Sequence, residues 1–271
     1  MSDSSVNRSN LSKLKFVANL STNFCDDDFC VRFEKARDSG FKAVEAQLLY
    51  DQNVKDLQKA RLKTDLKVVL MNSPAVSKNS GDHSLGIACV PGFEVEFLQS
   101  IHSAIIYATA LDCKKVHILA GLKDEKTKDE ELMPFYVQNL KQATEMLSEY
   151  NIQALIEPIC PQTKPLYFLD SYEKAKNVID EVQEDNLKLL LDVHHMHMLG
   201  LNVEDGIKQY LPLAGHVQIS QAPERREPFY PSGEINYARV FDLLVELGYG
   251  GYIGLEYVPS DYEKCFEWLK H

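Results

Sequence analysis

The sequence has no long apolar run, and this absence limits what the chain can be. No stretch of its 271 residues approaches the roughly 20 apolar residues that a membrane-spanning helix needs. The polar first thirteen residues also lack the apolar middle of a signal peptide, so we expect residues 1–13 to be a disordered leader. The chain is therefore expected to be soluble and to have no membrane partner.

Positive charge and paired cysteines are scarce as well. The chain carries 29 Lys and Arg against 40 Asp and Glu, a formal charge of −11. Because nucleic-acid binding requires a basic surface, we expect no nucleic-acid partner. The six cysteines are scattered without a CxxC pair, which is typical of reduced thiols in a cytoplasmic protein.

Short apolar runs alternate with helical patterns eight times. The expected strands are 15–21, 42–48, 66–72, 115–120, 153–159, 187–193, 215–220 and 252–257. The expected helices are 29–39, 54–64, 94–111, 129–150, 171–182, 203–210, 236–247 and 262–270, with Asn53 and Asp170 as caps for two of them. This order predicts the α/β class and a single (β/α)8 TIM barrel over residues 14–271. The loop 73–92 is expected to be a functional lid or a disordered insertion.

Four consecutive strands each carry an oxygen-bearing side chain near the carboxyl end: Glu157, Asp192, Gln218 and Glu256. In a closed parallel barrel these ends meet on one face, where the active site of this architecture lies. Three converging carboxylates would repel one another, and a divalent metal ion resolves that repulsion.

The chemistry of this metal set leaves the ion open. Oxygen ligands favour Mg²⁺ or Mn²⁺, whereas an inward His194 or His195 would favour Zn²⁺, and Co²⁺ is also open. A bound cation that chelates a hydroxy-keto unit acidifies its carbon-bound proton, and Glu157 and Glu256 could then act as base and acid. A simpler interpretation is that Asp192 caps the next helix and that the histidines face solvent.

Five further residues are candidates for substrate binding. His195 could hydrogen-bond a substrate hydroxyl, orient the nearby Asp or face solvent. His216 lies two residues before Gln218, so by strand alternation the two side chains point the same way. His216 is either a hydrogen-bond donor that supports the site or a core residue. Arg225 could hold a carboxylate in bidentate fashion, assisted by Lys123, although both could also be solvated loop charges. Glu45 lies inside a predicted strand, so we expect it either to pair with another side chain or to contact the substrate.

With these residues in view, the chain resembles hydroxypyruvate isomerases of the xylose-isomerase-like barrel group, over about residues 15–268. The stretches that carry the resemblance are FVANLS at 16–21, RFEKA at 32–36, GIAC.PG at 86–92, IEPI at 156–159, D..HM at 192–196, GH.QI at 215–219, GEINY at 233–237 and G.EY at 254–257.

The resemblance implies an intramolecular oxidoreductase of carbohydrate metabolism, an aldose–ketose type isomerase. Such an enzyme interconverts hydroxypyruvate and 2-hydroxy-3-oxopropanoate (tartronate semialdehyde) through a metal-stabilised enediolate. The resemblance also implies the catalytic pair Glu157 and Glu256 and a carboxylate-binding role for Arg225. The matching metal positions are Glu157, Asp192, Gln218 and Glu256.

The rim of the predicted site departs from the family pattern. Met71 stands where a histidine is usual, Leu85 where an arginine is usual, Cys160 where an asparagine is usual and Gln221 where an acidic residue is usual. The loop PFYPSGEI at 228–235 is also longer than the family's. The substrate, a small keto or hydroxy acid, is therefore left more open than the reaction class.

Other functions on this scaffold remain open. A sugar epimerase or keto-inositol dehydratase would share the fold, and a non-catalytic metabolite-binding barrel would share the metal site. An endonuclease acting at abasic sites is disfavoured by the charge of −11. The oligomeric state, including a homo-oligomer, is not indicated by the sequence.

Overall fold

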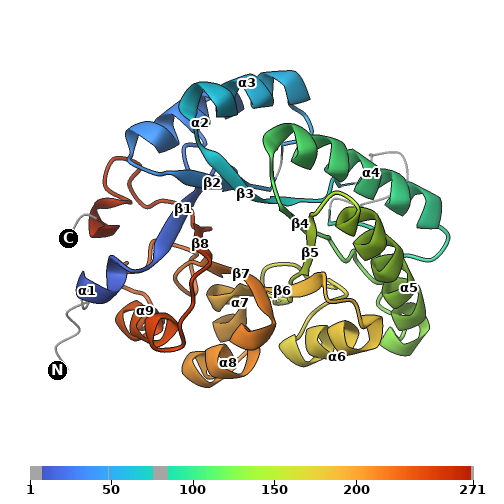
Figure 1. Cartoon of the computed structure of the whole chain (residues 1–271). Coiled ribbons are helices and arrows are strands. Elements are labelled where there is room, and N and C mark those ends of the chain that lie inside the picture. The colour runs from blue at the N-terminus through green and yellow to red at the C-terminus, as the bar shows by residue number, and fades with distance from the viewer. Residues whose placement is uncertain (1–7, 48, 76–84, 270–271) are drawn as a thin grey trace.

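Eight parallel strands close into one barrel in sequence order, and β8 pairs with β1 (Figure 1). This computed structural model describes residues 8–47, 49–75 and 85–269. The strands are β1 Lys15–Asn19, β2 Ala43–Ala46, β3 Lys67–Asn72, β4 Lys115–His117, β5 Gln153–Ile156, β6 Leu187–Asp192, β7 Ala214–Ile219 and β8 Tyr252–Leu255. The predicted (β/α)8 barrel is confirmed.

Helices surround the strands (Figure 1). They are α1 Arg8–Leu11, α2 Phe29–Asp38, α3 Val54–Thr64, α4 Glu94–Leu111, α5 Asp129–Ser148, α6 Tyr172–Val182, α7 Val193–Met198, α8 Val203–Tyr210 and α9 Tyr237–Glu246. The described residues also form two 3₁₀ turns, η1 Leu211–Leu213 between α8 and β7 and η2 Glu267–Leu269 after β8. Asn53 caps α3 as predicted, since its side chain accepts from the backbone N–H of Lys55.

The strands are buried on both faces, which explains why they read as continuous apolar runs. One face packs under the helices in the main core. The other face fills the barrel, where Leu70, Leu155 and Leu190 form a separate cluster. Because side chains alternate along a strand, Glu157 and Asp192, two positions after Leu155 and Leu190, point into the same interior.

Three expectations about the chain ends and caps are wrong. Residues 8–13 are not disordered: α1 forms there, and Asn10 Nδ2 donates to Asp242 Oδ1 on α9 at 2.8 Å. The closing helix 262–270 is replaced by turns and η2, where Trp268 stacks on Phe241 with ring centroids 5.8 Å apart. Ser171, rather than Asp170, caps α6.

The long loop after β3 is only partly described, because residues 76–84 lie outside the described residues, as do residues 1–7 of the expected leader. Its second part is anchored to the segment after β4, since Gly86 forms an antiparallel bridge with Ala120. A Cβ at Gly86 would lie 2.3 Å from the carbonyl oxygen of Leu119, so this close approach requires glycine. The lid interpretation stays a prediction.

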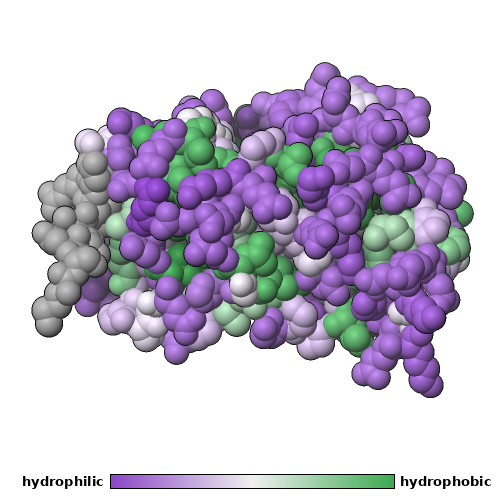
Figure 2. Space-filling model, turned by 90° about the horizontal axis from the view of Figure 1, so that it is seen from below, coloured by the Kyte–Doolittle hydropathy of each residue, from purple (hydrophilic) through white to green (hydrophobic). Residues whose placement is uncertain are grey.

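One face of the molecule is mostly polar. Figure 2 shows hydrophilic side chains over most of one face, interrupted by separate apolar patches. Among the described residues, no helix combines the length and apolar character needed to cross a membrane.

Two buried tyrosines give a test of this core. The hydroxyl of Tyr136 has no hydrogen-bond partner among the described residues, whereas the hydroxyl of Tyr172 donates to the backbone oxygen of Asp192 at 2.7 Å. Because an unsatisfied buried hydroxyl destabilises the folded state, we expect Tyr136→Phe to raise the free energy of unfolding by about 1 kcal/mol. Tyr172→Phe should lower it by about 1 kcal/mol in the same urea titration. Equal shifts in the two variants would contradict this assignment.

Candidate active site

The structure brings four polar side chains to the carboxyl end of the barrel. Glu157 directly follows β5, Asp192 ends β6, Gln218 lies in β7 and Glu256 directly follows β8. All four are buried. Strand alternation therefore turns an acidic layer inward, above the apolar cluster that fills the barrel.

Arg225, in the loop after β7, links the carboxylates. Its Nη2 lies 2.9 Å from Asp192 Oδ2 and 2.7 Å from Glu256 Oε2, and its Nη1 lies 3.0 Å from His195 Nε2. Burial alone would raise the pKa of Asp192, but Arg225 and the nearby histidines lower it to about 2. Asp192 is therefore ionised at neutral pH.

Glu157 has no such cation beside it. Its Oε1 is buried and has no hydrogen-bond partner in the described chain, and its Oε2 lies 3.5 Å from His117 Nδ1. Burial lowers the pKa of His117 to about 3, so this ring is neutral and gives no compensating charge. Burial, followed by repulsion from Glu256 and Asp192, raises the pKa of Glu157 well above its usual value.

The carboxamide of Gln218 is oriented from inside the barrel. Its Nε2 donates to Glu45 Oε1 at 2.8 Å, while its Oε1 is buried without a partner among the described residues. Glu45 also accepts from Asn19 Nδ2 at 2.8 Å, and its Oε2 lies 2.7 Å from His216 Nε2. A carboxylate surrounded by donors holds the amide nitrogen of Gln218 and leaves the amide oxygen for the site. Glu45 and His216 thus contact each other and support Gln218 from below.

Asp192 also begins helix α7. Its Oδ1 accepts from the backbone N–H groups of His194 at 2.7 Å and His195 at 3.4 Å. The capping interpretation is therefore right for one oxygen of Asp192, while the other faces Arg225. The accompanying prediction that the histidines face solvent is wrong for His194 and His195, which are 1% and 3% exposed. Burial lowers the pKa of His194 to about 4 and that of His195 to about 3.

The loop that carries Arg225 is held by another amide. Gln221 Nε2 donates to the carbonyl oxygens of Pro228 at 2.7 Å and Ile235 at 3.0 Å, and its Oε1 accepts from the backbone N–H of Ile235 at 2.8 Å. A carboxylate could not donate these bonds, so the amide suits this longer loop. The carbonyl of Arg225 accepts from the N–H of Val258 at 2.8 Å, which ties the loop to the segment after β8.

Lys123 belongs to a different cluster. Its Nζ lies 2.6 Å from Asp129 Oδ1 and 3.9 Å from Asp170 Oδ2. Lys174 binds the same two carboxylates at 2.5 and 2.6 Å. Because these carboxylates hold its ammonium group, Lys123 is not placed beside Arg225.

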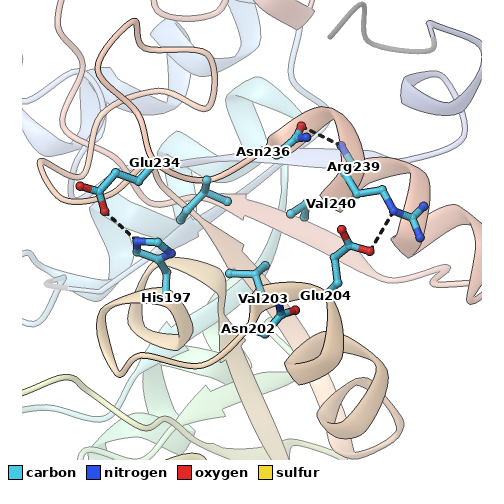
Figure 3. Close-up of a pocket in the computed structure, with 9 residues that line it drawn as sticks. His197, Asn202, Val203, Glu204, Glu234, Asn236, Arg239 and Val240 are labelled. Carbon is cyan, nitrogen blue, oxygen red and sulfur yellow. Dashed lines mark hydrogen bonds and ion pairs between the residues drawn. The ribbon is translucent and has the colours of Figure 1, made fainter. Parts of the chain in front are cut away.

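A small pocket between α7, α8 and α9 is separate from this site (Figure 3). It has a volume of about 140 Å³. Its charged groups already pair, with His197 Nε2 2.8 Å from Glu234 Oε2 and Arg239 Nε 3.0 Å from Glu204 Oε2. None of the predicted site residues lines it.

Two contact residues were missed by sequence reasoning. Gln47, directly after β2, donates from its Nε2 to Glu256 Oε1, and His117, at the end of β4, contacts Glu157. Both carry the signals that identified the other residues. Gln47 follows its strand as Glu157 does, and His117 interrupts an apolar run as His216 does.

The donor set fits a divalent cation. Ligand atoms of Glu157, Asp192 and His195 lie within 4.8 Å of one another. Gln218 adds a further oxygen ligand, because its Oε1, like the Oε1 of Glu157, has no hydrogen-bond partner among the described residues. Glu157, Asp192 and Glu256 are buried near one guanidinium, which pairs with the last two, so a second cation would relieve their repulsion.

A closed (β/α)8 barrel with carboxylates at the carboxyl ends of its strands has the active-site layout of TIM-barrel enzymes. The chain belongs to the xylose isomerase-like TIM barrel family, whose model matches residues 33–271.

Named relatives agree with this assignment. The chain is 37% identical over 247 residues to the hydroxypyruvate isomerase of Escherichia coli (strain K12), covering 91% of this chain and 94% of that protein. It is 37% identical over 245 residues to the 2-oxo-tetronate isomerase of Haemophilus influenzae, covering 90% and 93%. A crystal structure described as AP endonuclease, family 2 from Brucella melitensis matches with a TM-score of 0.89 and 31% identity, covering 95% of this chain and 98% of that one. The resemblance to hydroxypyruvate isomerases and the isomerase class are confirmed.

A glycine opposite Glu45 tests the support of Gln218. A Cβ at Gly254 would lie 2.2 Å from Glu45 Oε2, whereas nothing lies within 4 Å of one at Gly250. We expect Gly254→Ala to lower the free energy of unfolding by about 1–3 kcal/mol, because the buried carboxylate must move. Divalent-cation affinity should fall with it, since Gln218 loses its orientation.

Urea unfolding and calorimetric cation titration measure these two effects. Gly250→Ala is the matched control and should be neutral or stabilising by up to about 1 kcal/mol. The support described for Gln218 is wrong if Gly254→Ala and Gly250→Ala behave alike.

Proposed function

We propose that the chain is a divalent-cation-dependent isomerase that interconverts hydroxypyruvate and tartronate semialdehyde. The carrying observation is that Glu157 and Glu256, from non-neighbouring strands, are buried in one acidic site together with Arg225 and unpartnered oxygens. The isomerase relatives at 37% identity support the same chemistry.

The reaction requires one proton to move between neighbouring carbons. A carboxylate takes the proton from the hydroxymethyl carbon of hydroxypyruvate and leaves an enediol-type intermediate. A carboxyl group then returns a proton to the former keto carbon, while the hydroxyl proton passes to the other oxygen. Glu157 and Glu256 perform these two transfers, and no oxidant or reductant is consumed.

Burial raises the pKa of both glutamates well above its usual value, and Arg225 opposes that rise chiefly at Glu256. The two surroundings therefore differ, which suits an acid and a base. Glu256 contacts the guanidinium of Arg225 and the amide of Gln47, whereas Glu157 contacts only the neutral ring of His117 among the described residues. Their burial also keeps water away from the reacting carbon.

Arg225 and His195 bind the substrate. The guanidinium of Arg225 already pairs with the carboxylate of Asp192. Its planar set of N–H donors matches the carboxylate that hydroxypyruvate and tartronate semialdehyde both carry. His195 is neutral, and its Nε2 accepts from Arg225, so this nitrogen becomes available to a substrate hydroxyl when the guanidinium turns to the substrate carboxylate. Glu45 and His216 act indirectly by holding Gln218.

Glu157, Asp192, Gln218 and Glu256 would hold the divalent cation, with His195 within reach of the first two. When bound, the cation supplies positive charge that polarises the substrate carbonyl.

The test is turnover of hydroxypyruvate by chelator-treated protein, resupplied separately with Mg²⁺, Mn²⁺, Co²⁺ and Zn²⁺. We expect tartronate semialdehyde to form only after cation is restored. A folded protein that is silent with every cation would overturn the proposal. Parallel assays with 2-oxo-tetronate, which is one carbon longer, separate the two activities named for the relatives.

The two-glutamate mechanism makes a separate prediction. Glu157→Gln and Glu256→Gln should each lower kcat about 10²–10⁴-fold at saturating cation, because an amide cannot exchange the proton. Glu204→Gln, on the surface pocket of Figure 3, is the control and should retain full activity. Near-normal kcat in either buried variant would exclude that glutamate from proton transfer.

A further inference from the structure

A second group of ligand-type side chains adjoins the carboxylate site. Cys160, His194 and His195 are buried, and one ligand atom from each lies within 4.8 Å of the others. Cys160 comes from the loop after β5, and the histidines come from the first turn of α7. The group shares His195 with the carboxylate site but contains no carboxylate.

The spacing of sulfur and nitrogen is close to that of a metal centre. Cys160 Sγ lies 3.2 Å from His195 Nδ1 and 3.1 Å from Thr163 Oγ1. Two ligands on one tetrahedral Zn²⁺, with bonds of roughly 2.3 Å to sulfur and 2.1 Å to nitrogen, would be roughly 3.6 Å apart. Only a small adjustment separates the observed pair from that geometry.

The ring proton of His194 is fixed by a backbone carbonyl. Its Nδ1 lies 3.2 Å from the carbonyl oxygen of Gln221. A carbonyl oxygen only accepts, so Nδ1 carries the ring proton and Nε2 keeps its lone pair. Metal-binding histidines are held in the same way, with the second nitrogen donating to a backbone carbonyl or a carboxylate.

His195 can be held by a carboxylate. Its Nε2 lies 3.7 Å from Asp192 Oδ2 and 3.0 Å from Arg225 Nη1. Nδ1 now lies 3.3 Å from the backbone nitrogen of Cys160, a long hydrogen bond that coordination would replace. Coordination through Nδ1 puts the ring proton on Nε2, where Asp192 can accept it once Arg225 has moved away and the 3.7 Å separation has shortened.

We propose that Cys160, His194 and His195 form a second cation site that takes thiophilic divalent cations such as Zn²⁺ and excludes Mg²⁺ and Mn²⁺. A thiolate and two neutral imidazoles are soft and borderline ligands, unlike the oxygen set beside them. The thiol proton leaves to solvent on binding, and water or substrate completes the tetrahedral shell.

Occupation of this site has a consequence for catalysis, and this part rests on the proposed function. The bound ion coordinates His195 and displaces Arg225 from the imidazole ring of His195. Both proposed substrate-binding groups are therefore altered. Excess Zn²⁺ is therefore expected to inhibit the Mg²⁺- or Mn²⁺-supported enzyme, and Cys160→Ser should weaken that inhibition.

Cobalt absorption tests the site without any assay of turnover. Chelator-treated full-length protein is titrated with Co²⁺ in excess Mg²⁺, and the near-ultraviolet thiolate-to-cobalt charge-transfer band is recorded. The band should appear in the wild type and be lost in Cys160→Ser and reduced in His194→Gln. Cys113→Ser is the control, because Cys113 is another buried free thiol outside the group, and should keep the band.

The outcomes separate this proposal from the previous one. Absence of the band in the wild type, or its persistence in Cys160→Ser, overturns the second site. Visible cobalt bands without charge transfer would mean binding to the carboxylate site alone, which overturns the second site and leaves the isomerase proposal intact.

A measurement on the wild type covers the case in which the variants do not fold. Zn²⁺, but not Mg²⁺, should slow alkylation of Cys160 several-fold without changing that of the exposed Cys25, as followed by peptide mass. Equal rates of Cys160 alkylation with and without Zn²⁺ would contradict the site.

Discussion

The burial of several carboxylates at one end of the barrel is the constraint on which the rest of this structure depends. Glu157, Asp192 and Glu256 repel one another in a place with little water, and an uncompensated buried charge is very costly. Arg225 offsets part of this cost by contacting Asp192 and Glu256 through one nitrogen. Glu157 is left with an oxygen that has no hydrogen-bond partner among the described residues, which is the observation behind the proposed cation site.

The barrel supplies the rigidity that such a layer needs. Apolar side chains such as Leu155 and Leu190 fill the interior, and the pair of Glu45 and His216 lies among the inward-facing residues of the strands. That pair converts a flexible amide, Gln218, into an oriented oxygen donor. Strand alternation places the polar side chains at the strand ends directly above the apolar cluster. The packing of that cluster therefore fixes where the polar groups lie.

Two kinds of ligand chemistry meet at His195. On one side are the carboxylate oxygens of Glu157 and Asp192, whose ligand atoms lie within 4.8 Å of a ring nitrogen of His195. On the other side is the thiol of Cys160, at a position where the family pattern usually has asparagine. The imidazole of His195 lies between them, 3.2 Å from the sulfur and 3.0 Å from the guanidinium. A change in the partners of this one ring therefore affects both the guanidinium of Arg225 and the thiol of Cys160.

Much of the fold can be derived from the amino-acid order, because the signals are local. Apolar runs located the strands, and the residue at each strand end identified Glu157, Asp192, Gln218 and Glu256. Short segments depend on distant contacts: residues 8–11 form a helix that contacts α9, and residues 262–269 form turns and η2, where Trp268 packs on Phe241. Only the tertiary structure decided that Glu45 contacts His216, 171 positions away, that Arg225 joins two carboxylates and that Cys160 lies against His195. These contacts depend on how loops and strands far apart in the chain meet, and no local pattern encodes that meeting.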